Sequence, residues 1–382
     1  MEQIPNQAVR KSGFDTLGKS ASGPAGTGFA NSMSTHKSGF DTSGKGLLCA
    51  TEIAKLLRQG DRFVLAGHIG PDGDTIGSCF GLAMALGKLG KKAVVVLESY
   101  ADKYKIIPGK EYLYRFTAPL EMDIFIALDC ADKDRLSGPA RAFFDKAKTT
   151  ICIDHHETNE GFADYNFIEA EASSTAEMVY TVIDALTEID ADIATAIYSG
   201  IVSDTGGFRY MSTSKSTMDV AARLMETGIP FTKIYNELMH KHTFAAAKAL
   251  GLALENCKAI MDGRIVYTYI TREMLTSVGA ESSDMDSVVE YLMSTRGAEV
   301  ALFLYERHHN AKATDTTVES TPKDGQGKIK VSMRSSGLHV GRVAASLGGG
   351  GHRLAAGCTI VGTMEDVLCQ MLEVIEQAVA LA

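Results

Sequence analysis

Short, continuous apolar runs alternate with segments of helical periodicity over the first half of the chain. Four runs have the length of buried strands: 62–68 ("RFVLAGH"), 92–98 ("KAVVVLE"), 123–129 ("DIFIALD") and 149–154 ("TTICID"). Before the first run, 47–60, and between the first and second, 74–90, apolar residues recur at a spacing of three and four, which is typical of amphipathic or buried helices. Regular alternation of strand and helix predicts an α/β fold, a parallel sheet with helices on both faces.

The pattern changes in the last third of the chain. Segments 263–271, 298–307 and 328–336 read as strands, and three others read as helices: 284–295, 341–348 and 364–379. This mixture predicts a smaller α+β domain over 257–382. Helical segments at 174–187, 189–202 and 214–227 would complete a first domain over 47–230, and 231–256 is expected to be a helical linker. Residues 1–46 are rich in Gly and Ser, contain a near-duplicate nonamer, and are expected to be a disordered low-complexity tail.

Composition narrows the classes of function. The 382 residues are 45% hydrophobic and 22% charged, which is typical of a globular protein. A net charge of −9 argues against an extended binding surface for long nucleic acid, because binding many phosphates needs many Lys and Arg. It does not exclude a local pocket that binds a small anion. Seven scattered Cys without a CxxC pair fit a reducing compartment. Since no membrane-spanning stretch or signal core is visible, we expect a cytoplasmic protein; its oligomeric state stays open, with a homodimer as one option.

Polar residues collect where the predicted strands end. His68 ends the first run, Asp129 the third, and Asp154, His155 and His156 the fourth. The carboxyl ends of parallel strands meet at one edge of a sheet, which is where ligands bind in such folds. Further acids follow nearby in sequence or precede a glycine pair: Asp72, Asp74 and Asp204.

Each of these residues has a simpler explanation when taken alone. Asp72, Asp74 and Asp129 could cap helices, Asp204 could begin a turn, and His68 could be a hydrogen-bonded histidine at the end of a strand. The convergence of these residues at one edge of the predicted sheet favours metal binding instead, because several carboxylates in one crevice would repel one another without a cation. Carboxylates with imidazoles and no thiolates suit Mn²⁺, with Mg²⁺ as the alternative.

Two adjacent histidines in "ICIDHHETN" suggest two different tasks. If the strand stays extended through 154–156, the side chains of His155 and His156 point to opposite faces. One imidazole could then turn toward a metal ion and the other toward a substrate.

The ordered segments "HIGPDGD", "LDCAD", "IDHHETN" and "GIVSDTGGFRY" resemble the four motifs of the DHH phosphoesterases. The ending "VSMRSSGLHVGRVAASLGGGGHRLAAGCTI" resembles the DHH-associated substrate-binding domain with its GGGGH signature. Together they span about 47–382, and the size is most similar to the branch of stand-alone oligoribonucleases and 3′-phosphoadenosine 5′-phosphate phosphatases. The resemblance implies that 47–230 is the catalytic domain and that 257–382 binds substrate.

The resemblance also implies a role for each matching residue. His68, Asp72 and Asp129 would hold one Mn²⁺, and Asp74, Asp129, His155 and Asp204 the second, with Asp129 bridging. His156 would act on the substrate, and Asp154 would orient a neighbouring imidazole. The substrate-binding residues would be Arg334, Ser335, Gly349, Gly350, Gly351 and His352. By itself, the glycine run fits a helix C-cap as well as an anion-binding nest, and a lone Arg at a strand end is usually just solvated.

The implied reaction is hydrolysis by water activated between two metal ions. The substrates would be short single-stranded oligoribonucleotides, cut to 5′-mononucleotides, and 3′-phosphoadenosine 5′-phosphate, which would lose its 3′-phosphate. A cyclic- or linear-dinucleotide phosphodiesterase of the same family is the alternative. Less favoured are an inorganic pyrophosphatase, which usually has a different second domain, and a nucleotide-binding protein without catalysis.

Overall fold

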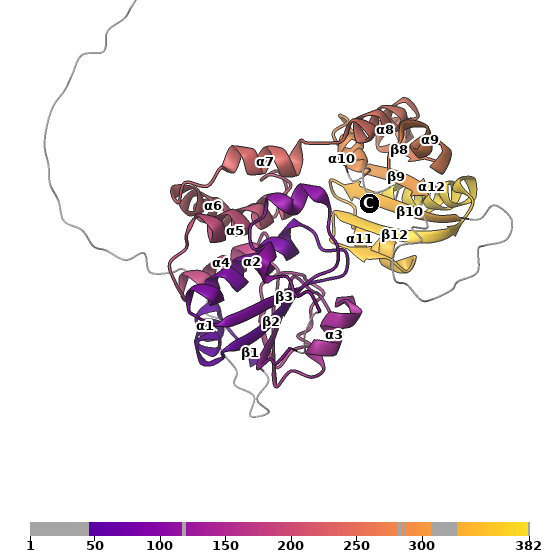
Figure 1. The fold of residues 1–382 in the computed structure, drawn as a ribbon. Helices are drawn as coiled ribbons and strands as arrows, with labels where there is room; N and C mark the ends of the chain where they lie inside the picture. The colour runs from indigo at the N-terminus through magenta and orange to yellow at the C-terminus, as the bar shows by residue number, and fades with distance from the viewer. Residues whose placement is uncertain (1–45, 117–119, 282–284, 286, 307–326, 381–382) are drawn as a thin grey trace, which may run out of the picture. The chain divides into compact units, whose positions relative to one another are not determined.

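The computed structural model describes residues 46–116, 120–281, 285, 287–306 and 327–380 (Figure 1). Two six-stranded sheets organise this part of the chain. The predicted disordered tail, 1–46, lies almost entirely outside the described residues. The domain boundaries proposed from the sequence therefore stay predictions.

The first sheet is entirely parallel, with the strand order β1-β6-β5-β4-β2-β3. Its strands are short and mostly apolar, as buried parallel strands are. Their bounds are β1 Gly46–Leu47, β2 Arg62–Ala66, β3 Lys92–Val96, β4 Ile124–Leu128, β5 Thr149–Asp154 and β6 Tyr165–Ile168.

Helices cover both faces of this sheet. Phe63 and Leu65 of β2 face a large core with α1, α2, α4 and α5, whereas Val64 and Ala66 face a smaller core with α3. This alternation follows from the two-residue period of a strand. The helices are α1 Ala50–Gln59, α2 Gly73–Lys88, α3 Gly138–Phe144, α4 Thr175–Asp184, α5 Ala191–Asp204 and α6 Lys215–Glu226. The α/β prediction for this region is confirmed.

Helices α2 and α5 pack almost backbone to backbone. A methyl group on Gly77 of α2 would lie 2.4 Å from the carbonyl oxygen of Ala196, and one on Gly200 of α5 would lie 3.4 Å from Cα of Asp74 in α2. Only glycine leaves room for such an approach. The close packing brings Asp74, in the first turn of α2, near Asp204, the last residue of α5.

The second sheet is mixed, with the order β11-β12-β10-β9-β8-β7; β8 and β9 are parallel and the other pairs antiparallel. One face packs on α11 and α12, and the other on α8, α9 and α10. The strands are β7 Lys258–Ile260, β8 Ile265–Ile270, β9 Val300–Glu306, β10 Gly327–Ser335, β11 Gly350–Gly351 and β12 Ala355–Gly362. The helices are α8 Phe244–Glu255, α9 Arg272–Val278, α10 Val288–Met293, α11 Val340–Ser346 and α12 Met364–Ala380.

The predicted linker helix over 231–256 is two helices in the structure. Helix α7 spans Phe231–Met239, and α8 begins after Thr243, whose side chain caps it by accepting from the N–H of Ala246. Thr243 has an extended backbone, so the chain leaves the helical conformation between the end of α7 and the start of α8. Among the described residues, no helix is both long enough and apolar enough to cross a bilayer.

Candidate metal centre

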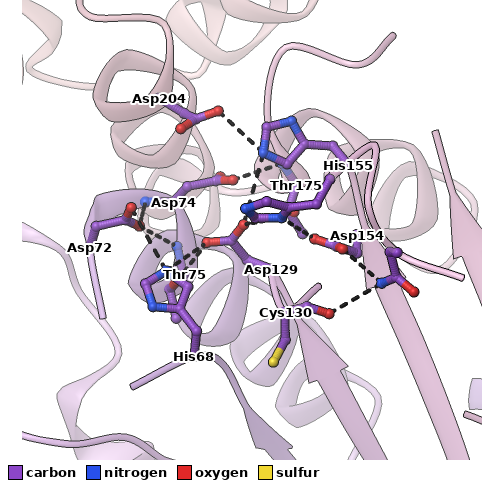
Figure 2. A network of polar contacts seen from close by, with 12 residues as sticks. His68, Asp72, Asp74, Thr75, Asp129, Cys130, Asp154, His155, Thr175 and Asp204 are labelled. Atoms are coloured by element: carbon purple, nitrogen blue, oxygen red, sulfur yellow. Dashed lines mark hydrogen bonds and ion pairs between the residues drawn. The ribbon is translucent and has the colours of Figure 1, made fainter. Parts of the chain in front are cut away.

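The candidate site lies at the carboxyl edge of the first sheet. His68 follows β2, Asp129 follows β4 directly, and Asp154 is the last residue of β5; these three strands are neighbours in the order β5-β4-β2. Figure 2 shows their side chains converging with those of Asp72, Asp74, His155 and Asp204. The sheet order therefore assembles residues that are up to about one third of the chain apart.

One group of possible ligands contains His68, Asp72 and Asp129, whose donor atoms lie within 4.8 Å of one another. Nε2 of His68 is 3.5 Å from Oδ2 of Asp129 and 3.8 Å from Oδ2 of Asp72. Asp72 also caps α2, because its Oδ1 accepts from the N–H groups of Asp74 and Thr75. The capping explanation and the ligand explanation of Asp72 are thus compatible, since each uses a different oxygen.

A second group contains Asp74, Asp129 and His155, again within 4.8 Å. Asp204 adjoins this group, with its Oδ2 3.3 Å from Nε2 of His155. The two groups share Asp129, as expected of a carboxylate that bridges two ions.

Backbone contacts orient the two imidazoles toward these groups. Nδ1 of His155 lies 3.2 Å from the carbonyl oxygen of Ala172, and Nδ1 of His68 lies 2.9 Å from that of Ile69. A carbonyl only accepts hydrogen bonds, so each Nδ1 carries a proton, and each Nε2 is the nitrogen that faces the carboxylates. Nε2 is therefore the atom that a metal ion would take on each ring.

Threonine hydroxyls and main-chain amides fix the carboxylates. Thr75 Oγ1 donates to Oδ2 of Asp129 at 2.5 Å, and Thr175 Oγ1 to Oδ1 at 3.3 Å. Asp74 accepts from the N–H groups of Thr175 and Ala176 at 2.7 and 2.8 Å, in the first turn of α4. Asp129 itself has a left-handed backbone, with φ of 56°, which is strained for a residue with a side chain.

The electrostatics of the cluster favour a bound cation. Burial and the neighbouring carboxylates Asp129 and Asp204 hold the pKa of Asp74 well above its usual value, and burial raises the pKa of Asp204 to about 7. Burial alone would lower the pKa of His68, but contacts with Asp129 and Asp72 raise it to about 11. A proton on His68 therefore balances the charge of these acids, and a divalent cation would replace it more effectively.

These donors fit divalent metal ions. Oxygen and imidazole ligands without thiolates suit Mn²⁺ and Mg²⁺, and both ligand groups combine carboxylates with one imidazole. All six residues predicted as metal ligands thus meet at one place, while their roles stay predictions.

His156 and Asp154 contact each other beside these ligand groups, and together with Asp129 they form a further group whose donor atoms lie within 4.8 Å. Nδ1 of His156 donates to Oδ1 of Asp154 at 2.7 Å, and Nδ2 of Asn159 donates to Oδ2 of the same carboxylate at 2.7 Å. Asn159 also donates to the carbonyl oxygen of Cys130, which anchors it. Asn159 was missed in the sequence analysis, although its place in "IDHHETN", three residues after His156, was a signal for it.

The expectation that His155 and His156 point to opposite faces is wrong. Strand β5 ends at Asp154, and the two rings lie edge to face with centroids 5.0 Å apart. A turn follows at once, in which the N–H of Asn159 donates to the carbonyl oxygen of His156. The two imidazoles are distinguished by their partners, Ala172 for one and Asp154 for the other.

His352, one of the predicted substrate residues, contacts the two histidines of this centre. Its ring stacks on that of His156 with a centroid distance of 5.0 Å and an interplanar angle of 19°. Burial, followed by the charges of His156 and His155, lowers the pKa of His352 to about 4.

The other predicted substrate residues have local structural contacts. Ser335 Oγ accepts from the N–H groups of Gly337 and Leu338. The N–H of Gly349 donates to Ala344 and so caps α11, while Gly350 and Gly351 form β11. The helix-cap explanation is confirmed for Gly349, Gly350 and Gly351 pair with β12, and a role of the run in binding substrate stays a prediction.

Comparisons with known proteins agree with this geometry. The model described as "DHH family, N-terminal domain" matches residues 62–201, and that of the "DHHA1 domain" matches 262–381. A protein of Thermus thermophilus named "Bifunctional oligoribonuclease and PAP phosphatase NrnA" is 31% identical over 82% of this chain and 89% of its own length. The chain belongs to the DHH family.

Other DHH proteins show the same extent of similarity. A Bacillus subtilis protein of the same name is 25% identical over 81% of this chain and 93% of its own length. The crystal structure of an exopolyphosphatase-related protein from Bacteroides fragilis superposes with a TM-score of 0.73 at 27% identity, covering 86% of this chain and 94% of that one. The likeness to the DHH fold thus extends through both sheets.

Proposed function

We propose that this protein is a phosphoesterase, dependent on two divalent metal ions, that cuts short oligoribonucleotides to 5′-mononucleotides. We propose that it also removes the 3′-phosphate of 3′-phosphoadenosine 5′-phosphate. The observation that carries the proposal is the pair of ligand groups that share Asp129 at the edge of the sheet. The names of the Thermus thermophilus and Bacillus subtilis relatives support the choice of substrates.

In this proposal, 47–230 forms the catalytic domain, 231–256 links it to the next, and 257–382 binds substrate. His68, Asp72 and Asp129 would hold one ion, and Asp74, Asp129, His155 and Asp204 the other, with Mn²⁺ as the expected metal and Mg²⁺ as the alternative. When bound, such ions polarise a phosphoryl oxygen and lower the pKa of water. The ligands themselves are preorganised by Thr75, Thr175 and the first turn of α4.

His156 would bind the reacting phosphoryl group or protonate the leaving oxygen. Its Nδ1 is committed to Asp154, so Nε2 is the atom available to the substrate. Asp154 has no exposed surface, and Asn159 holds its second oxygen, so the ring of His156 is fixed in orientation. Arg334 and His352 would grip a terminal phosphate or nucleotide, with Ser335 and the segment from Gly349 to Gly351 lining the same region.

Charge supports a preference for small substrates. The chain carries 47 acidic residues against 38 Lys and Arg, an excess of nine negative charges. A long strand needs a continuous basic groove, whereas a nucleotide of one to five residues needs only a few donors near the metal centre.

One assay tests the proposal and ranks the substrates. Purified protein with Mn²⁺ receives equal concentrations of 3′-phosphoadenosine 5′-phosphate, a linear dinucleotide, a five-residue RNA, a cyclic dinucleotide and pyrophosphate. We expect 5′-AMP with phosphate from the first and 5′-mononucleotides from both RNA substrates. Faster turnover of the cyclic dinucleotide or of pyrophosphate would move the assignment to another activity of the family, and no hydrolysis of any would refute it. Asp129→Asn is the control, because it removes the shared ligand.

A further inference from the structure

Arg334 is held by an acidic residue from a neighbouring helix. Arg334 lies near the end of β10, and its Nε donates to Oε1 of Glu290 at 2.5 Å. Glu290 belongs to α10, whose Val288, Val289 and Leu292 are buried against the sheet. The contact is half-buried, with side-chain exposures of 27% for Arg334 and 24% for Glu290. The glutamate is therefore anchored on a packed element.

The contact leaves one edge of the guanidinium open. Besides the bond from Nε, Nη1 donates to the carbonyl oxygen of Met333 at 3.0 Å. Among the described residues, Nη2 makes no hydrogen bond, and Nη1 has a second hydrogen to donate. Nη1 and Nη2 together form the fork that binds phosphate oxygens in pairs.

A second arginine of the same domain shows the contrast. Arg264 donates from Nε and Nη2 to both carboxylate oxygens of Glu299, at 2.8 and 2.9 Å, and Nη2 also reaches the carbonyl oxygen of Val379. This pair is a closed, bidentate ion pair of the kind that stabilises a fold. The pair of Glu290 and Arg334 is joined through Nε alone, which fixes the plane of the guanidinium without using its fork.

We propose that Glu290 is a positioning residue that holds the guanidinium of Arg334 with its Nη fork directed to a phosphate group of the substrate. The inference rests on the proposed function, because it takes Arg334 to be a substrate-binding residue. An arginine side chain has several rotatable bonds, and fixing it before binding lowers the conformational entropy lost on binding. Arg334 would then bind the phosphate in the rotamer that it already has before binding.

Tyr210 adds a second contact to Glu290. Burial, and then the charge of Glu290, raise the pKa of the Tyr210 hydroxyl. Tyr210 follows the candidate metal ligand Asp204 by six residues. Glu290 thus contacts the arginine expected to bind phosphate and a tyrosine from the segment that contains a candidate metal ligand.

Binding of 5′-AMP, the expected product, tests the proposal independently of turnover. The dissociation constant is measured by calorimetry for the full chain with Mn²⁺, as wild type and as Glu290→Ala, Glu290→Gln and Glu299→Ala. We expect Glu290→Ala to weaken binding about tenfold, the size of one lost hydrogen bond. Glu290→Gln should stay within about threefold of wild type, because its amide oxygen still accepts from Nε.

Glu299→Ala is the matched control, since it removes the partner of Arg264, and its binding should equal that of wild type. The inference would be overturned by unchanged or tighter binding in Glu290→Ala, by equal losses in the Ala and Gln variants, or by absence of 5′-AMP binding to wild type. Hydrolysis of 3′-phosphoadenosine 5′-phosphate by the wild type is assayed in parallel. An active enzyme whose affinity for 5′-AMP ignores Glu290 would refute the positioning role alone, and an inactive protein whose binding depends on Glu290 would refute the proposed function alone.

Discussion

Exchange of each histidine of the "DHH" tripeptide for alanine should separate metal binding from chemistry. His155 presents Nε2 to Asp204 at 3.3 Å and to Asp129 at 3.9 Å, whereas His156 is bound through Nδ1 to Asp154. We therefore expect His155→Ala to lose affinity for metal and His156→Ala to keep it.

The size of each effect follows from these contacts. Loss of a group that only supports a ligand costs about 10- to 100-fold in metal affinity, so loss of a direct ligand should exceed about 100-fold, or about 2.7 kcal/mol. We expect the affinity of His156→Ala to stay within about threefold, because Nδ1 of His156 is bound to Asp154 at 2.7 Å and lies farther, at 3.7 Å, from the candidate ligand Asp129. Its kcat should fall by about 10²- to 10⁴-fold, the usual contribution of a positioned acid or base.

Equilibrium dialysis against Mn²⁺ with metal analysis measures the bound ions in both variants. Steady-state hydrolysis of 3′-phosphoadenosine 5′-phosphate gives kcat at saturating metal, and melting curves in EDTA show that both variants are folded. Equal loss of bound Mn²⁺ in the two proteins would refute the division of labour, as would full metal binding by His155→Ala.

Three further outcomes follow from the same contacts. Asn159→Ala leaves one oxygen of the buried Asp154 without a donor and should destabilise the fold by about 1–3 kcal/mol in urea unfolding, while metal binding changes little. Thr175→Val removes a hydroxyl from Asp129 at nearly constant volume and should weaken Mn²⁺ binding about tenfold in dialysis; unchanged affinity would show that the hydroxyl does not orient that carboxylate. Mn²⁺ at about 100 times its Kd should stabilise the wild type by about 2.7 kcal/mol and raise its melting temperature, and a shift of equal size in His155→Ala would contradict the ligand assignment.

Apolar runs were sufficient to predict the strands that carry the site. β2, β4 and β5 are buried on both faces, so each contains a run of apolar residues: "FVLA", "IFIAL" and "ICI". β12 was missed because it is built from "AAGCTIVG", in which Ala and Gly have a low strand propensity. Its place is set by pairing with β10 over eight positions, which is a tertiary constraint.

The candidate ligands could be picked out because each follows a strand or stands at an end of a helix, which are positions that the local pattern reveals. The residues that hold them could not, because their roles depend on contacts across the chain. Thr175 lies 46 positions from Asp129, Asn159 lies 29 from Cys130, and Glu290 lies 44 from Arg334. Before the fold is known, a threonine at a helix start or a glutamate in a helix has no distinguishing mark. The directions of His155 and His156 were predicted wrongly because β5 ends at Asp154 and a turn begins at His156, which the local sequence does not reveal.

The glycine contacts between α2 and α5 bear on which ions the centre accepts. Asp74 lies in the first turn of α2 and Asp204 ends α5, and at Gly77 the backbones of the two helices are in direct contact. A site that could widen would take Ca²⁺, whose oxygen ligands lie at about 2.3–2.6 Å, as readily as an ion that prefers about 2.0–2.1 Å. Because the backbones of α2 and α5 touch at Gly77, we expect the site to resist widening and to prefer the smaller ions, through residues that are not themselves candidate ligands.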